Sequence, residues 1–370
     1  MLLRLGDRGP AVAEVRSRLT HLGLLDDVDA PTQTGGRTQP ADCFDDALDV
    51  AVRTFQQERG LTVDGIVGPD TYRRLEEARW QLGDRILQFV PGHLINGDDV
   101  TQLQRRLSEL GFDCGRLDGV FGHRTDRALR EFQRSVGVRP DGTCGPETFR
   151  AFDRLVRTVS GGNAATLREF ITLTHLRTGV ADKVIVLDPE SGQGSEICQA
   201  IAGRVEGRLA ALGTQVLLTS AASAHTNPDE SERADFANRT GAHLVVSLRV
   251  DTVTSPLPNG VVSFYFGDPQ GGLHSYAGRA LAELIQEEIC ARTTMRDCRT
   301  HPRTWDLLRN TRMPAVRVEL GYLSNPSDRR ALLSSGYHDA VASAIATAVT
   351  RLCAPDEPVG EDSSATPIGR

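Results

Sequence analysis

The chain has 370 residues, of which 39% are hydrophobic and 25% charged, and its formal net charge is −7. A chain of this length and composition has room for two or three globular domains. Its acidic balance argues against nucleic acid or an anionic membrane surface as the main partner. The seven cysteines are scattered, with no Cys-x-x-Cys pair among them, so we expect reduced thiols in a cytosol.

The N-terminal half contains an internal repeat. Residues 60–71 have the sequence Gly-Leu-Thr-Val-Asp-Gly-Ile-Val-Gly-Pro-Asp-Thr, which returns at residues 137–148 as Gly-Val-Arg-Pro-Asp-Gly-Thr-Cys-Gly-Pro-Glu-Thr. Apolar residues at helical spacing lie upstream of both copies, in runs that end at Gly23 and Gly111. The Gly-Pro pair in each copy predicts the start of a further helix, because proline is favoured at the first helical position. Each copy is therefore expected to be a small three-helix unit.

Three-helix units with Asp-Gly-x-x-Gly-Pro-x-Thr resemble the peptidoglycan-binding domain 1 family, and we expect the two copies over residues 1–80 and 95–155. The resemblance implies a groove for the stem peptide or glycan of peptidoglycan, although the same surface could serve a protein partner. Residues 156–182 are predicted to form a linker that contains a short helix.

Residues 183–353 have the pattern of an α/β domain. The β-branched run at residues 184–187 ends in Asp188-Pro189, which is typical of a buried strand that runs into a loop. Further predicted strands alternate with helices up to Cys353, which indicates a sandwich around a mostly parallel central sheet. The predicted fold class is thus multidomain, with two all-α three-helix repeats followed by an α/β domain.

This order of elements resembles the zinc-dependent N-acetylmuramoyl-L-alanine amidases of the amidase_3 family. The resemblance rests on Asp188-Pro189 at the end of the first strand, Glu196 at the start of the first helix and Ser247 in the third strand. It also rests on residues 314–325, which have the pattern Pro-Ala-x-x-x-Glu-x-Gly-Tyr-x-Ser-Asn. These matching residues are spread over the whole C-terminal half of the chain.

Two of the three zinc ligands that the resemblance implies are missing. The family's histidines fall on Ser191 and Arg249, which leaves Glu196 as the residual ligand, while Glu319 falls on the family's catalytic acid. Catalytic zinc usually has three protein ligands and a water whose pKa it lowers. A guanidinium has no lone pair to donate and stays protonated. We therefore expect no zinc cofactor and a vestigial Glu319.

Arg249 is expected to replace the metal as a structural cation. If Glu196 and Glu319 converge on the former zinc position, the planar guanidinium of Arg249 would pair with both carboxylates. The alternative is an active N-acetylmuramoyl-L-alanine amidase, which hydrolyses the bond between muramic acid and the stem peptide. It would need metal held by Glu196 and a compensating ligand, or hydrolysis without metal. Among the histidines, His301 falls where the family's substrate cleft is lined.

The N-terminal and C-terminal sequences predict where the protein is located and which residues could be modified. The N-terminal sequence shows no charged region followed by an apolar stretch and a cleavage site, and no apolar stretch is long enough to span a membrane, so a cytoplasmic location is expected. Residues 354–370 have almost no large apolar side chains and are predicted to be disordered. Ser363, Ser364 and Thr366 are candidate phosphorylation sites there, although an inert solubilising tail is an equal alternative.

The whole architecture is similar to the CwlM group of actinobacterial proteins, in which the same two histidines are lost. The resemblance implies a cytoplasmic regulator, controlled by a Ser/Thr kinase, of the first committed enzyme of peptidoglycan precursor synthesis, UDP-N-acetylglucosamine carboxyvinyltransferase. Peptidoglycan precursors or muropeptides are the expected further ligands, with no nucleic acid and no membrane span.

Overall fold

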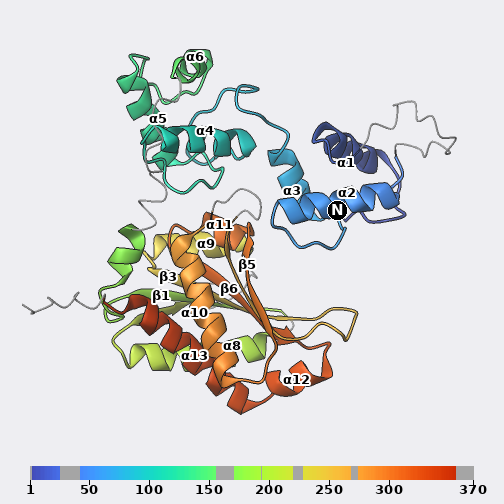
Figure 1. The fold of residues 1–370 in the computed structure, drawn as a ribbon, viewed down its shortest axis with the longest axis vertical. Helices are drawn as coiled ribbons and strands as arrows, with labels where there is room; N and C mark the ends of the chain where they lie inside the picture. The colour runs from blue at the N-terminus through green and yellow to red at the C-terminus, as the bar shows by residue number, and fades with distance from the viewer. Residues whose placement is uncertain are drawn as a thin grey trace, which may run out of the picture.

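The computed structural model describes residues 2–25, 42–155, 171–192, 194–219, 228–267 and 274–355. Two helical repeats lie on one side of an α/β domain (Figure 1). The predicted phosphorylation sites Ser363, Ser364 and Thr366 lie outside the described residues. Within the described ranges, no helix combines the length and the hydrophobicity that a membrane crossing requires.

Each repeat contains three helices, as the sequence predicts. The first repeat consists of α1 (Pro10–His21), α2 (Asp46–Glu58) and α3 (Pro69–Glu77), and the second of α4 (Asp98–Glu109), α5 (His123–Ser135) and α6 (Pro146–Arg154). Both α3 and α6 begin with the predicted proline. The two repeats have separate apolar cores, which include Phe55 in the first and Phe132 in the second.

Buried glutamines hold the Asp-Gly turns of the repeats. Gln56 is 1% exposed, and its side-chain amide donates to the side chains of Asp64 and Thr71 and to the carbonyl of Ile66 at 2.8–3.1 Å. Its side-chain oxygen accepts the backbone N–H of Gly65 at 2.9 Å. One side chain thus contacts four polar groups, three in the turn that precedes α3 and one, the Thr71 hydroxyl, in the first turn of α3.

The same arrangement occurs twice in the second repeat. Gln133 makes the equivalent four bonds to the turn at residues 141–148. Gln104 on α4 makes them to the turn at residues 118–125, which the sequence analysis missed because this copy has Gly-His in place of Gly-Pro. Each repeat is therefore built from two helix–turn halves. In the first half of the first repeat Arg16 replaces the glutamine and donates to the carbonyl of Cys43.

The C-terminal domain is a six-stranded sheet between two helical layers, with strand order β2-β1-β3-β6-β4-β5. β4 is antiparallel to β6, and the other neighbouring strands are parallel. The predicted mostly parallel sheet is confirmed. The strands are β1 (Val184–Pro189), β2 (Gln215–Leu218), β3 (Leu244–Asp251), β4 (Val261–Phe266), β5 (Asp297–Arg303) and β6 (Ala315–Tyr322).

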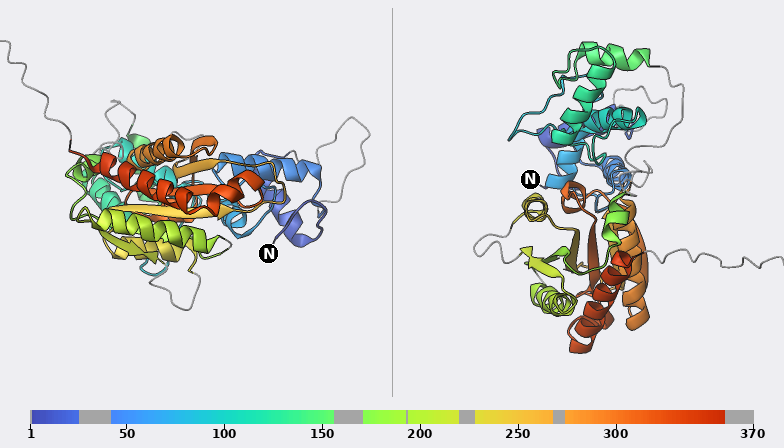
Figure 2. Two further views of the ribbon diagram at one scale, coloured as in Figure 1. Left: turned by 90° about the horizontal axis from the view of Figure 1, so that it is seen from below. Right: turned by 90° about the vertical axis from the view of Figure 1, so that its left-hand side faces the viewer.

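The helices cover the two faces of this sheet (Figures 1 and 2). The larger apolar core lies under α8 (Ser195–Ala210), α10 (Tyr276–Arg292) and α13 (Ser335–Cys353). The smaller core on the other face lies under α9 (Glu230–Arg239) and α11 (Asp306–Asn310). The short helix α12 (Pro326–Leu332) follows β6. This arrangement leaves the carboxyl ends of β1, β3 and β6 side by side.

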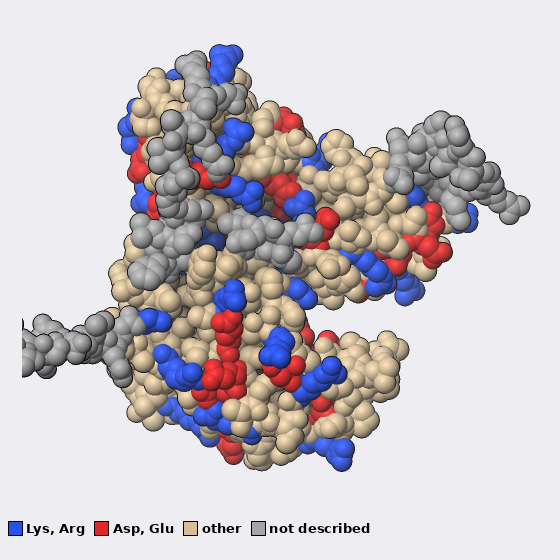
Figure 3. Space-filling model, viewed as in Figure 1, with Lys and Arg blue, Asp and Glu red and all other residues tan. Residues whose placement is uncertain are grey.

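Charged side chains of both signs are mixed on the face of the molecule that Figure 3 draws. On the face drawn in Figure 3, Lys and Arg side chains lie among Asp and Glu, and neither sign forms a continuous band. A mixed face of this kind offers no basic stripe for a phosphate backbone.

Candidate active site

The site lies where β1, β3 and β6 end. The strand register pairs Asp188 on β1 with Ser247 on β3, and Arg249 on β3 with Glu319 on β6. Because the three strands are parallel, their carboxyl ends lie at one edge of the sheet. α/β proteins usually bind their ligands at this edge. The structure therefore brings Arg249 and Glu319 to neighbouring strands, as the sequence predicts.

Asp188 binds four side chains at this edge of the sheet. It is fully buried, and its carboxylate accepts hydrogen bonds from Thr219 at 2.7 Å and from Ser247 at 2.8 Å. Arg249 pairs with it at 2.6 Å and Arg233 at 3.4 Å. Burial alone would raise the pKa of Asp188, but these two guanidiniums and the two hydroxyls outweigh burial and hold the pKa below its usual value.

Arg249 points into the sheet edge toward Asp188. Its side chain is buried, and besides the carboxylate it donates to the carbonyls of Asp188 and Leu248, both at 2.9 Å. A buried ion pair made by Arg249 is thus present, but the expected partners Glu196 and Glu319 are wrong. The reason is positional, because Glu196 is exposed on the first turn of α8 whereas Asp188 lies one strand away from Arg249.

Glu319 is buried beside a different arginine. It is 8% exposed and accepts a hydrogen bond from Arg317 at 3.2 Å. Burial raises the pKa of Glu319, with Arg317 opposing that rise and Asp251 adding to it. Arg317 in turn lies over the ring of Trp305, with its guanidinium carbon 4.2 Å from the ring centroid. The raised pKa of Glu319 thus follows from its burial, which the single hydrogen bond from Arg317 does not offset.

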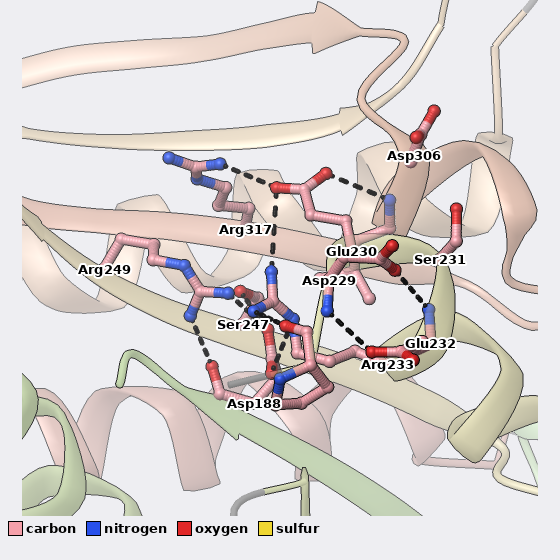
Figure 4. Close-up of polar contacts among 12 residues, drawn as sticks. Asp188, Asp229, Glu230, Ser231, Glu232, Arg233, Ser247, Arg249, Asp306 and Arg317 are labelled. Carbon is pink, nitrogen blue, oxygen red and sulfur yellow. Dashed lines mark hydrogen bonds and ion pairs between the residues drawn. The ribbon is translucent and has the colours of Figure 1, made fainter. Parts of the chain in front are cut away.

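A chain of alternating charges connects these two centres (Figure 4). Asp188 pairs with Arg233 on α9, Arg233 with Glu230 at 3.9 Å, and Glu230 with Arg317 at 3.3 Å. Glu230 also accepts the backbone N–H of Leu307 at the start of α11. Sequence reasoning missed Arg233, Glu230 and Arg317, since nothing in their local sequence distinguishes them from arginines and acids on a solvated face.

The donor atoms at this edge do not fit a catalytic zinc ion. Ser191 and Glu196 are exposed, and the buried side chain of Arg249 is a guanidinium, which has no lone pair to donate to a metal. His301 is also exposed, and its Nε2 lies 2.9 Å from the carbonyl of Cys298. Within the described ranges, no three His, Cys, Asp or Glu side chains are grouped so that they could hold a metal.

Comparison with known proteins shows the family of the chain. The profile of the N-acetylmuramoyl-L-alanine amidase family matches residues 190–351, and that of the putative peptidoglycan binding domain matches residues 8–75 and 96–152. N-acetylmuramoyl-L-alanine amidase CwlM of Mycobacterium tuberculosis is 46% identical over 365 residues, which cover 95% of this chain and 89% of that protein. The chain belongs to the N-acetylmuramoyl-L-alanine amidase family. The resemblance to the CwlM group is thereby confirmed.

More distant members of the amidase family match the C-terminal domain alone. The germination-specific N-acetylmuramoyl-L-alanine amidase of Bacillus subtilis is 27% identical over 199 residues, which cover 46% of this chain and 80% of that protein. The structure of amidase AmiC2 of Nostoc punctiforme is 27% identical, covers 46% of this chain and 96% of its own, and has a TM-score of 0.41.

Proposed function

We propose that this chain is a catalytically inactive member of the amidase family that regulates peptidoglycan precursor synthesis from the cytoplasm. One observation carries the first half of the proposal. The guanidinium of Arg249 is buried against Asp188 at 2.6 Å on the strand where the family has a histidine ligand. A fixed positive charge there repels a dication, and it is itself held by three acceptor groups.

The loss of the metal position disables the chemistry even though Glu319 is retained. Amide hydrolysis in the zinc-dependent family uses a metal-bound water, whose pKa the zinc lowers to near neutrality. Glu319 could accept or donate a proton, but it lacks an activated nucleophile. Ser191 offers only a neutral hydroxyl on an exposed loop.

The regulatory half of the proposal rests on likeness over nearly the whole chain to a CwlM protein, including both repeats. The proposed partner is UDP-N-acetylglucosamine carboxyvinyltransferase, and a Ser/Thr kinase would control the interaction through Ser363, Ser364 or Thr366. The repeats would contribute contacts to muropeptides or peptidoglycan precursors. Active amidase is the second candidate, which the buried position and raised pKa of Glu319 favour.

Metal content and hydrolysis separate the two candidates. We expect the purified wild-type chain to contain no stoichiometric zinc by elemental analysis and to release no stem peptide from muropeptides. The Ser191→His, Arg249→His double variant restores two imidazole ligands, so we expect it to gain up to one zinc per chain. Glu319→Gln is the control, because activity from a contaminating amidase would persist in it. One zinc per wild-type chain, with hydrolysis that Glu319→Gln abolishes, would establish an active enzyme.

The regulatory activity has its own assay. We expect the chain, after treatment with a Ser/Thr kinase, to raise the rate of product formation by purified UDP-N-acetylglucosamine carboxyvinyltransferase from the same organism. A Ser363→Ala, Ser364→Ala, Thr366→Ala variant should lose the effect of the kinase, because no hydroxyl remains at the three candidate positions. An unchanged enzyme rate with the treated wild-type chain, together with no binding by calorimetry, would exclude this partner.

A further inference from the structure

A short segment of the amidase domain contacts both repeats. Residues 304–311, here called the docking segment, follow β5 in the connection to β6 and include α11. Figure 1 and the right-hand view of Figure 2 place α11 at the end of the α/β domain that faces the repeats. Seven hydrogen-bonding or ion-pairing side chains make contacts across this boundary, four from the repeats and three from the docking segment. They are Arg73, Arg74, Glu77 and Arg116 on one side and Thr304, Asp306 and Arg309 on the other.

Arg309 lies at the centre of the boundary. It is 5% exposed, and its Nη1 donates to both carboxylate oxygens of Glu77, at 2.8 and 3.1 Å, at the end of α3 in the first repeat. Its Nε donates to the backbone carbonyl of Asp118, in the Asp-Gly turn of the second repeat. One side chain of the amidase domain therefore contacts both repeats at once.

The repeats contact the docking segment in return. Arg116 of the second repeat donates to the carbonyls of Leu308 and Thr311 at 3.0 and 2.9 Å. Arg74 of the first repeat donates to the carbonyl of Thr304 at 2.8 Å. Leu308 and Thr311 lie at the C-terminal end of α11, where helix carbonyls have no partner within the helix, so Arg116 is suited to satisfy them.

The charges at the boundary depend on one another. Glu77 is 6% exposed and accepts hydrogen bonds from both Arg309 and Arg74. Burial would raise the pKa of Glu77, but these two guanidiniums hold it below its usual value. Without Glu77, two arginines would face each other in a buried site. In Arg309→Glu, the new carboxylate would lie against the carboxylate of Glu77, and the two like charges would repel each other.

The second repeat is shaped for this contact. Gly119 has a φ of +71°, and a Cβ at that position would lie 2.8 Å from Nη2 of Arg309 and 2.6 Å from the hydroxyl of Thr101. Glycine thus permits both the turn and the close approach of the arginine. The Asp-Gly turns at Gly65 and Gly142 have arginines of their own helices at the equivalent distance. Only the turn at Gly119, among these three, has its close arginine supplied by the amidase domain.

We propose that the two repeats form an intramolecular receptor for the docking segment, so that repeats and amidase domain move as one body with Arg309 and Glu77 as the fixing contact. The partner of this surface is the chain's own amidase domain. The end of α3 and the Asp118–Gly119 turn are then covered, and a cell-wall ligand would have to bind elsewhere on the repeats or displace the segment. This inference holds for an active or an inactive amidase.

Hydrogen exchange and small-angle scattering of the full chain test the proposal. In Arg309→Glu we expect exchange protection of peptides from α3 and residues 304–311 to fall by on the order of 100-fold. We also expect the radius of gyration to rise, since the domains separate. Arg312→Glu is the matched control, because Arg312 is exposed one residue beyond the docking segment.

Two further measurements separate undocking of the repeats from unfolding of the amidase domain. Peptides from β1 and β3 should keep their protection in Arg309→Glu, which separates undocking from unfolding of the amidase domain. Arg116→Ala removes two contacts from the repeat side and should also raise the radius of gyration. The proposal is overturned if Arg309→Glu and Arg116→Ala both keep the wild-type radius of gyration and protection. It is also overturned if the wild-type scattering shows the repeats moving independently of the amidase domain.

Discussion

Asp188→Asn is expected to lower the free energy of unfolding of the amidase domain by about 3–5 kcal/mol, as removal of one partner from a buried ion pair does. Asp188 is fully buried and lies against both Arg249 and Arg233, so the neutral amide would leave two guanidiniums without their shared anion. Asparagine has nearly the same volume, which confines the change to charge and hydrogen bonding. The chain has two tryptophans, Trp80 and Trp305. In a Trp80→Phe background, Trp305 fluorescence during urea unfolding reports on the amidase domain.

Asp235→Asn provides the control for this substitution. Asp235 is exposed on α9, and its loss should change stability by less than about 0.5 kcal/mol. The pH dependence gives a second check. Because the pKa of Asp188 is lowered in the folded state, its contribution is present above the unfolded carboxyl pKa and is lost as pH falls through the lower folded pKa. Acid sensitivity that is the same in Asp188→Asn as in the wild type would show that the ion pair does not stabilise the domain.

The sequence specified those features that local patterns control. The Asp-Gly turns repeat at residues 64–65 and 141–142, and the Gly-Pro pairs start α3 and α6 as predicted. The β-branched run ending in Asp188 forms a buried central strand. Alternating strands and helices predicted a mostly parallel sheet, and parallel strands necessarily bring their carboxyl ends to one edge. The placement of Arg249 beside Glu319 follows from this.

The partners of the arginines could not be predicted in the same way. Arg249 can reach acids on either neighbouring strand or on a helix, and only the packed structure shows that Asp188 is the one it contacts. Arg233 and Arg309 have the helical spacing of surface residues, yet each reaches a buried carboxylate on another element. Arginine has a long, flexible side chain, so its contacts depend on tertiary geometry more than on sequence position. The site residues that sequence reasoning missed are mainly of this kind.

The helix glutamine that binds each Asp-Gly turn shows a further limit of sequence patterns. Phe55-Gln56 and Phe132-Gln133 are visible as repeated pairs, whereas the role of the glutamine emerges only from its four hydrogen bonds. Gln104 performs the same role without a preceding phenylalanine and before a turn that lacks proline. The shared physical requirement is a buried side chain that can both donate and accept, which glutamine meets and glutamate does not.

Gln56→Ala should accordingly weaken the first repeat. The substitution removes the partner of the buried backbone N–H of Gly65, whereas the exposed Asp64 still accepts the N–H of Ile66 and the Thr71 hydroxyl still donates to the carbonyl of Ile66. A buried polar group left unpaired costs about 1–3 kcal/mol, and we expect a loss of that size. Hydrogen exchange of peptides that cover residues 46–77 measures the local free energy of opening in the full chain.

Gln57→Ala is the matched control for this prediction, because Gln57 is the next residue of α2 and its side chain is exposed. Alanine favours helix at both positions, so a difference between the two variants isolates the hydrogen bonds of the buried amide from helix propensity. Gln56→Glu adds a second comparison, since it keeps the acceptor for Gly65 but places a second carboxylate beside Asp64. If Gln56→Ala and Gln57→Ala open with equal free energies, the turn is held by its backbone conformation and the glutamine contributes nothing measurable.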